Sequence, residues 1–242
     1  MEKLNRFGLI LFVVIFPCFA NTQVLLKPVN VVLNKELIKA SHTFQKVIIF
    51  DSLGNKQDEL MNESIIKIDS LNGHIIFSRF RQSPFGTHHM DTSIAQLSNM
   101  APLNLNSSNN PLKKSLAIKF DENNVKVHAF IKGRFNDTVF NMENGYYDDN
   151  TIERFIGYFK LQKGVKYKLN AFRYESNGNN PYEFEYLFDD LFVAQNNNLI
   201  KCFVIKYSNK YVNGYIWYEI ATGQMLKELG FSKNGSFVVI AS

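Results

Sequence analysis

Cysteine is scarce in this chain of 242 residues, which contains only Cys18 and Cys202. Cys18 lies in an N-terminal segment that we expect to be removed, so the mature chain lacks the second thiol that an internal disulfide needs. Cys202 lies in an apolar run with no histidine close in sequence, which favours a buried, inert thiol over a nucleophile. The fold must therefore be stabilised by a hydrophobic core. A composition of 45% hydrophobic and 14% aromatic residues can supply one.

Blocks of charge of one sign are also missing, although the formal net charge is +5 and the pI is about 9.0. The nearest clusters are Lys113-Lys114 and the spaced residues Lys163, Lys166 and Lys168. Their spacing is that of residues on the solvent-exposed face of a strand, and they do not form a continuous basic surface that would bind nucleic acid. We therefore expect no nucleic-acid partner, and weak peripheral contact with an anionic membrane surface stays open.

Recognised catalytic and cofactor motifs are absent as well. The chain has no Gly-x-Ser-x-Gly, no His-Glu-x-x-His, no Cys-x-x-Cys, no phosphate-binding glycine loop and no dinucleotide fingerprint. We therefore expect a non-enzymatic protein with no catalytic residues, no metal site and no cofactor.

One segment, His88-His89-Met90-Asp91, combines two imidazoles with a carboxylate and so resembles a metal site in composition. Adjacent residues of a strand point to opposite faces, so His88 and His89 would chelate together only if the loop curled. We interpret the segment as part of an exposed polar loop over Ser83–Asp91. A second exposed connection is expected over Asn104–Pro111.

Three pairs of carboxylates, Asp148-Asp149, Glu183 with Glu185, and Asp189-Asp190, raise the hypothesis of a glycosidase, which needs an acid and a base flanking a bond. The pair at 183 and 185 lies on a strand face opposite a row of aromatic residues and is most simply solvated. The pair at 148 and 149 is explained as the start of a helix. A hydrolase is therefore a weaker hypothesis than the two non-enzymatic functions, a ligand-binding protein and a protein-interaction module.

The N-terminal segment, residues 1–20, has the features of an export leader. A positively charged start precedes an apolar run over residues 7–16, which is too short to span a bilayer comfortably. Residues 18–20, which end in a small residue, then form an acceptable cleavage site for a signal peptidase. The proline before Cys18 disfavours lipid attachment there. We expect cleavage after residue 20, one β-rich domain over residues 21–242, and a periplasmic or extracellular location.

Apolar and polar residues alternate along much of the remaining chain, which is typical of strands with one buried face. Residues 64–68 and 74–81 flank Asn72-Gly73, a dipeptide that suits a tight hairpin turn. Val125–Ile131 alternates in the same way. Tyr182–Phe188 places four aromatic residues on one face. These patterns predict a mainly β fold with meander connections.

One segment departs from this pattern, because four apolar residues fall on a single helical face: Ile152, Phe155, Ile156 and Phe159. Asn150 and Glu153 form a start that resembles a capping box, and we predict a helix from Thr151 to about Phe159. Gly157 destabilises this helix by about 1 kcal/mol relative to alanine, so packing must hold it. A lone amphipathic helix among strands is expected to cover a sheet or close a barrel mouth.

Three segments carry a family resemblance: Asp91–Leu103, Asn150–Gly164 and Trp217–Lys227. Their order resembles an uncharacterised family of exported bacterial proteins, grouped as a domain of unknown function and similar in architecture to the LolA and LolB lipoprotein carriers. The resemblance implies an open or half β-barrel, which is a strongly curved antiparallel sheet with one short covering helix and a concave side that can hold an acyl chain. The abundance of Asn, Lys, Ile and Phe also resembles Bacteroidetes proteins.

Large aromatic residues on the strand faces can fill a core or line a pocket. The leading hypothesis is an exported, non-enzymatic protein that binds a hydrophobic or lipid-like ligand in the concavity. The alternative is a structural or protein-interaction module of the cell envelope, with an envelope protein as its partner. The candidates for the cavity lining are Phe44, Phe77, Phe130, Phe155, Phe172, Phe184, Phe203 and Trp217.

Overall fold

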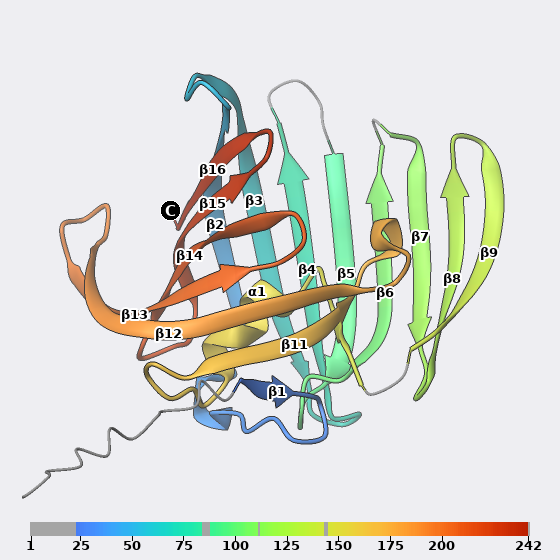
Figure 1. Cartoon of the computed structure of the whole chain (residues 1–242), viewed down its shortest axis with the longest axis horizontal. Helices are drawn as coiled ribbons and strands as arrows, with labels where there is room; N and C mark the ends of the chain where they lie inside the picture. The colour runs from blue at the N-terminus through green and yellow to red at the C-terminus, as the bar shows by residue number, and fades with distance from the viewer. Residues whose placement is uncertain (1–22, 84–87, 111, 143–144, 242) are drawn as a thin grey trace, which may run out of the picture.

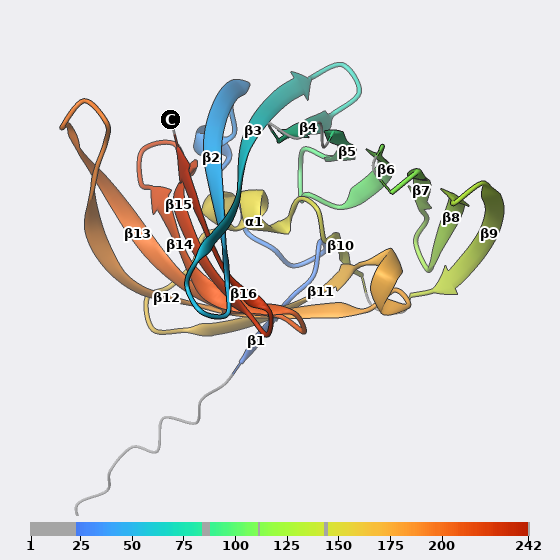
Figure 2. The same ribbon diagram turned by 90° about the horizontal axis from the view of Figure 1, so that it is seen from above.

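One large sheet bends strongly round a short helix (Figures 1 and 2). The structure, a computed structural model, describes residues 23–83, 88–110, 112–142 and 145–241. It confirms the mainly β fold with a strongly curved antiparallel sheet and one short helix. The leader predicted over residues 1–20 lies outside the described ranges.

The strands follow one another along the sheet in the order β1, β11 to β16, then β2 to β9. The first part comprises β1 (Val24–Leu26), β11 (Lys166–Phe172), β12 (Asn180–Val193), β13 (Leu199–Ser208), β14 (Val212–Glu219), β15 (Met225–Ser232) and β16 (Gly235–Ala241). The second comprises β2 (Ser41–Asp51), β3 (Lys56–Asp69), β4 (His74–Gln82), β5 (His88–Gln96), β6 (Pro102–Asn109), β7 (Lys114–Phe120), β8 (Asn124–Ile131) and β9 (Arg134–Asn141). The two parts join where β16 pairs with β2, placing Val238 opposite Ile48.

All pairings along this path are antiparallel except that of β1 with β11, and the short β10 (Tyr147–Asp148) also joins β11 in parallel. The helical segments are α1 (Ile152–Phe155) and the 3-10 turns η1 (Lys35–Leu37), η2 (Ile156–Tyr158) and η3 (Tyr174–Ser176). Figure 2 shows α1 inside the curve of the sheet.

The sheet does not close into a barrel, because its end strands along the described chain, β1 and β9, do not pair. Side chains connect the β7–β9 part of the sheet to the end of β11 instead. Phe140 on β9 lies edge-on to Phe172 on β11 at 5.3 Å, and Lys114 forms an ion pair with Glu175 in η3. The molecule is therefore an open barrel whose seam is held by side-chain contacts.

Two hydrophobic clusters fill the concave side. The larger surrounds α1 and η2 and includes Phe155, Leu169, Ile205 and Tyr218, all fully buried. The smaller lies under β6, β7 and β8 near the seam, where Val125 and Phe172 belong to it. Alternation explains both clusters, because every second residue of each strand faces inward.

The predicted hairpin is confirmed: β3 and β4 pair from Met61 opposite Gln82 to Asp69 opposite His74. Gly73 closes the turn with a φ of +66°, a conformation that favours glycine. The alternation predicted for β8 is also confirmed, because Val125, Val127 and Ala129 are buried.

The first polar connection was predicted too long, and the second was predicted wrongly. Residues 88–91 begin strand β5, while residues 84–87 lie outside the described chain. Residues 104–109 belong to β6. Their side chains alternate in the register of the neighbouring strands, so these residues can pair in the sheet although few of them are apolar.

The row of four aromatics predicted on one face of β12 is broken. Tyr182 and Phe184 face the core, but the register with β13 shifts between Tyr186 and Phe188. This bulge turns Phe188 opposite Val204, and Phe188 is 44% exposed. Strand periodicity alone does not predict such a bulge.

The predicted helix is present but shorter, and its start differs. Thr151 is the N-cap residue, and it makes no side-chain capping bond. The Asn150 side chain instead accepts a hydrogen bond from Arg79 at 3.4 Å, so the capping box is wrong. The last predicted turn is the 3-10 segment η2. This helix is held by packing, as its poor propensity requires.

Candidate functional site

The helix α1 is fixed within the concavity by contacts from opposite sides of the sheet. Phe155 lies edge-on to Phe77 of β4, with ring centroids 4.6 Å apart. From the other side, the Tyr218 hydroxyl donates a hydrogen bond to the Glu153 carbonyl oxygen at 2.5 Å. These contacts fix the positions of the polar residues of α1, Glu153 and Arg154, between β4 and β14.

The close approach of η2 to the turn after β14 explains an unfavourable residue in the helical segment. A Cβ atom on Gly157 would lie 2.0 Å from the Gly223 carbonyl oxygen. A backbone this close leaves no space for any other residue type at position 157.

Three arginines lie beside α1 on the concave side. Arg79 and Arg81 continue the inward register of Ile75 and Phe77 along β4, and Arg154 comes from α1. The three lie close enough that the charge of Arg79 lowers the pKa of both Arg81 and Arg154, and the charge of Arg154 lowers that of Arg81. A cationic cluster thus adjoins the apolar core.

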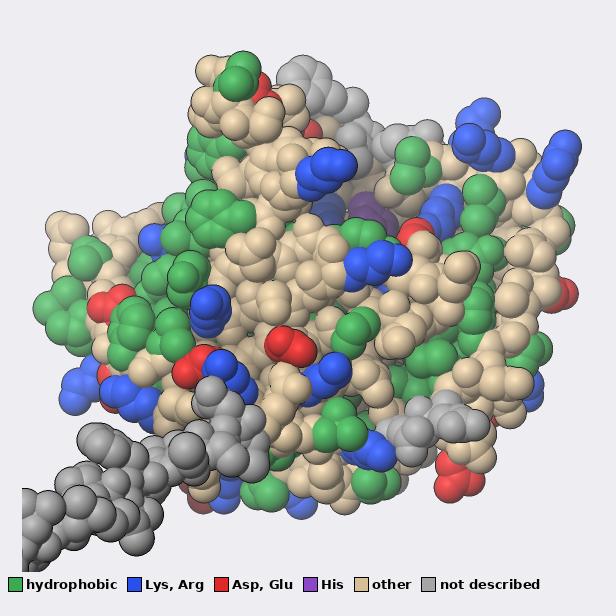
Figure 3. Space-filling model, in the orientation of Figure 1, with side chains coloured by type: hydrophobic (Ala, Val, Ile, Leu, Met, Phe, Trp, Pro, Cys, Tyr) green, Lys and Arg blue, Asp and Glu red, His purple; other side chains and the backbone are tan. Residues whose placement is uncertain are grey.

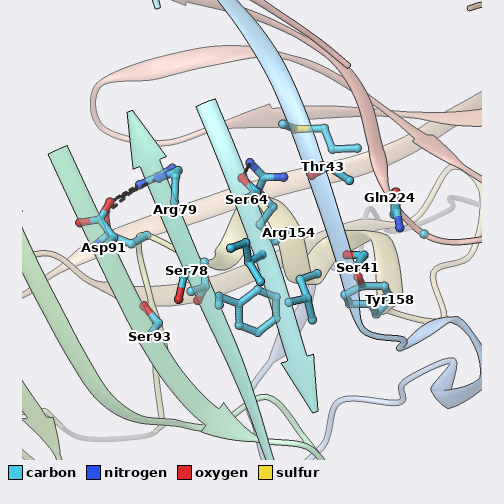
Figure 4. Close-up of a pocket in the computed structure, with 17 residues that line it drawn as sticks. Ser41, Thr43, Ser64, Ser78, Arg79, Asp91, Ser93, Arg154, Tyr158 and Gln224 are labelled. Atoms are coloured by element: carbon cyan, nitrogen blue, oxygen red, sulfur yellow. Dashed lines mark hydrogen bonds and ion pairs between the residues drawn. The ribbon is translucent and has the colours of Figure 1, made fainter. Parts of the chain in front are cut away.

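Two of the three arginines have partners (Figure 4). Arg79 donates to the Asp91 carboxylate from Nη2 at 2.8 Å and from Nε at 3.3 Å, and these side chains are 13% and 5% exposed. Arg154 donates from Nη2 to Gln45 Oε1 at 2.7 Å and to Ser64 Oγ at 2.8 Å. Arg79 is therefore neutralised, whereas the charge of Arg154 meets neutral acceptors.

Arg81 differs from the other two arginines. Its Nε atom is buried and has no hydrogen-bond partner among the described residues. The charge of Arg79, followed by burial, lowers the pKa of Arg81 to about 10. Arg81 is thus a half-buried cation whose buried Nε has a hydrogen bond left to donate.

The nearby carboxyl groups divide into ionised and neutral members. Burial opposes ionisation of Asp91, but the His89 hydrogen bond and the Arg79 charge outweigh burial and lower its pKa. Burial raises the pKa of Asp148 to about 7, and burial with the Glu153 charge raises that of Glu228 to about 8. Glu228 consequently bears little negative charge at pH 7, where it accepts a hydrogen bond from the Tyr207 hydroxyl.

Two hollows flank the arginine cluster. The apolar hollow, about 330 Å³, lies over the adjacent strands β15, β16, β2 and β3 and is lined by Val47, Leu60, Phe237 and Val239 among others. The polar hollow, about 270 Å³, lies toward the seam and is lined by residues such as His89, Ser107, Asn109 and Arg173. Both hollows are bounded by Arg79, Arg81 and Glu153. This shared wall places charge at the junction of an apolar and a polar space.

The aromatic candidates occupy different environments. Phe77 and Phe172 are buried and also line hollows. Phe155 and Phe184 are buried in the core, and Phe203 is half-buried against Tyr218 with ring centroids 5.3 Å apart. The other three lie on the face opposite the core: Phe44, which is 46% exposed, Phe130 beside Phe135, and Trp217, which donates to Asp190 at 2.9 Å. The structure does not bring the eight together.

Sequence patterns did not identify the charged residues of the site, although the sequence contains a signal for them. Arg79 and Arg81 stand at inward positions of β4, and Glu228 stands at an inward position of β15 opposite Ile216. Charge in a register that is otherwise apolar is unusual, because an unpaired buried charge is costly. This pattern marks the concave side as a candidate functional site.

Neither a metal centre nor a membrane-spanning helix is found in the described part of the chain. No three side chains of His, Cys, Asp or Glu gather there as metal ligands. No described helix has the length and apolar character to cross a bilayer. Figure 3 shows acidic and basic side chains interspersed over one face, without a block of either sign.

Comparisons with known proteins identify a family and one solved structure of similar fold. The profile of a family described as "Protein of unknown function (DUF3108)" matches residues 73–223. The crystal structure of a β-barrel-like protein of the domain of unknown function DUF1849 from Brucella abortus superposes with a TM-score of 0.58 at 9% identity, covering 84% of this chain and 95% of that one. The hypothetical lipoprotein YmcC from Escherichia coli reaches a TM-score of only 0.30 at 7% identity, covering 85% and 89%. No curated protein matches.

Proposed function

Because the chain belongs to the DUF3108 family of proteins of unknown function, we propose a function from the geometry of its concave side. The protein is an exported, non-enzymatic carrier that binds a lipid-like ligand in the apolar hollow. The observation that carries the proposal is a space of about 330 Å³ that α1 leaves unfilled. Small-molecule sites are concave, largely apolar and of this size or larger.

Three features support this proposal. The hollow is walled by apolar side chains of β2, β3, β15 and β16, including Val47, Leu60 and Phe237. The leader pattern of residues 1–20 supports export to the cell envelope. The resemblance to the LolA and LolB carriers supports the same class of ligand.

The test is displacement of the fluorescent probe N-phenyl-1-naphthylamine from the mature protein by a lipid extract of cell envelopes. We expect saturable probe binding and its loss when the extract is added. Leu60→Trp should fill the hollow and weaken probe binding at least tenfold, while Leu71→Trp, at a position 99% exposed, should leave it unchanged. Probe binding that is absent, or equal in both variants, would overturn the proposal.

A second candidate function, an interaction module of the envelope, is favoured by one observation. Strand β9 pairs on one side only within the described residues and exposes Phe135 and Val139 by 71% and 60%. An exposed apolar edge can accept a strand from another protein. Phe135→Lys with Val139→Lys should then abolish crosslinking to an envelope protein without affecting probe binding, and unchanged crosslinking would exclude this edge.

A further inference from the structure

The distribution of donors in the arginine cluster points to a binding role for one residue. Arg79 is held by Asp91, and the Nη2 of Arg154 is held by Gln45 and Ser64. Arg81 has a buried Nε without a partner among the described residues, and it stands in the wall shared by the two hollows. A ligand that enters the apolar hollow therefore meets Arg81 at the hollow's charged end.

We propose that Arg81 binds the acidic group, a carboxylate or a phosphate, of an amphipathic ligand whose apolar part occupies the apolar hollow. This assignment rests on the proposed function and names the class of ligand. A planar guanidinium matches both acidic groups through parallel N–H···O bonds, which are stronger than bonds between neutral groups. The ligand is an anionic lipid or fatty acid rather than a neutral one.

The charge balance of the cluster favours an anion. The three guanidinium groups share the cluster with the acidic side chains of Asp91, Glu153 and Asp148, and Asp148 is only partly ionised at pH 7 because burial raises its pKa to about 7, so positive charge is in excess. Glu228, the other acid lining the apolar hollow, is largely protonated at neutral pH because it is buried. A buried charge without a counterion is strongly unfavourable, and a bound acidic group supplies the missing counterion.

The neighbouring spaces fit the two parts of such a ligand. On one side of Arg81 the lining of the apolar hollow includes Val47, Val239 and Phe237. On the other side the polar hollow offers Ser107 and Asn109. A head group larger than the acid itself can extend into the polar hollow while the chain stays in the apolar one.

The experiment compares two probes on the mature full-length protein. One is 11-(dansylamino)undecanoic acid, which has a carboxylate on an apolar chain, and the other is the neutral N-phenyl-1-naphthylamine. Arg81→Gln should raise the Kd of the acid probe at least tenfold and change that of the neutral probe less than twofold. Arg134→Gln, which removes an exposed arginine of β9, should change neither.

The outcomes separate the two proposals. If neither probe binds the unmodified protein, the proposed function and this assignment both fail. If both bind and Arg81→Gln weakens neither, or weakens both equally, the assignment alone is overturned. Should Arg81→Gln fail to fold, Arg81→Lys takes its place. Lysine keeps the charge but lacks the planar group that makes two parallel hydrogen bonds, so this variant must weaken binding of the acid probe and leave binding of the neutral probe unchanged.

Competition distinguishes the source of the acidic group. Displacement of the acid probe by palmitate, but not by lysophosphatidylglycerol, indicates a carboxylate ligand, and the reverse indicates a phosphate. Displacement by both indicates that Arg81 accepts either group. If neither competitor displaces the probe, the assignment is overturned.

Discussion

Asp91 is the residue on which the arginine cluster depends. Its carboxylate accepts two bonds from Arg79 and lies 3.1 Å from His89 Nε2, in a nearly buried position. A buried ion pair adds little net stability, but removal of one partner leaves an uncompensated charge. Replacing Asp91 should therefore lower the stability of the fold by more than the ion pair itself contributes.

Asp91→Asn should lower the free energy of unfolding by about 3 kcal/mol, because Arg79 is then left buried without its counterion. Urea denaturation monitored by tryptophan fluorescence measures the change. The matched control is Asp137→Asn, whose carboxylate pairs with His128 but is 78% exposed, and it should have little effect. Equal effects of the two substitutions would contradict a buried ion pair.

Glu228 should make the protein less stable as the pH rises, whereas an acid in a salt bridge makes a protein more stable as the pH rises. Burial raises its pKa in the folded state to about 8 from an ordinary value of 4.5, so the folded chain keeps a proton that the unfolded chain releases. The free energy of unfolding should fall as pH rises from about 5 to 8. Glu228→Gln should flatten this decline and be more stable than the unmodified protein at pH 8.

Denaturation series at several pH values test this expectation. Asp148, whose folded pKa is about 7, contributes a decline of the same sign over pH 4 to 7, so Glu228→Gln removes only part of the slope. Glu183→Gln, which changes an exposed carboxylate on the opposite face of β12, is the control and should keep the full slope. A slope unaltered by Glu228→Gln would show that this carboxyl ionises normally.

At the scale of single elements, strand periodicity predicted which face of β8 points inward and that β3 and β4 form a hairpin, and both predictions were confirmed. It did not predict what the inward face is for. Ile75 and Phe77 fill the core, whereas Arg79 and Arg81 two and four residues later bound a hollow. The difference depends on residues of β15 and β16, which line the same hollow but are distant in sequence, and no local pattern contains them.

The same limit explains the other errors among the elements. The polar residues of β5 and β6 pair in the sheet because their neighbours supply partners, and propensity is a weak guide in that context. The start of α1 differs because Asn150 is drawn to Arg79, which is 71 residues away in sequence. The candidate site depends on such long-range contacts, so its position could not be predicted from the sequence.

Gly157→Ala tests the contact that fixes η2. Alanine ordinarily favours helical structure by about 1 kcal/mol over glycine. Here its Cβ would meet the Gly223 carbonyl oxygen at 2.0 Å, and overpacking of this kind costs about 1–3 kcal/mol. We expect a net loss of stability in thermal denaturation, while Lys160→Ala, at an exposed position just beyond η2, should have almost no effect. Stabilisation by Gly157→Ala would refute the close approach.

At the scale of the whole molecule, the seam between β9 and β11 is the weakest part of the barrel, because it has side-chain contacts but no described ladder of hydrogen bonds. Phe140 packs against Phe172 and Tyr174 across it. Opening at this seam would widen the polar hollow, whose lining includes Phe172 and Tyr174.

Phe140→Ala should therefore loosen the seam without unfolding the rest of the sheet. Hydrogen exchange measured by mass spectrometry should become faster in β9 and η3 and stay unchanged in β13 and β14. Phe135→Ala removes an exposed ring from the same strand and serves as the control. Faster exchange spread evenly over all strands would indicate global destabilisation instead.

The pairing of β16 with β2 has a consequence for how the chain acquires its structure. Almost two hundred residues separate Val238 from Ile48, and their strands lie in the middle of the sheet rather than at an edge. Contacts this distant in sequence form slowly, and β2 keeps a bare flank until its neighbour is delivered. Strands β2 to β9 are synthesised before β16, so the edge of β2 stays unpaired and prone to aggregation until β16 is made. This edge is where a chaperone would protect the chain most.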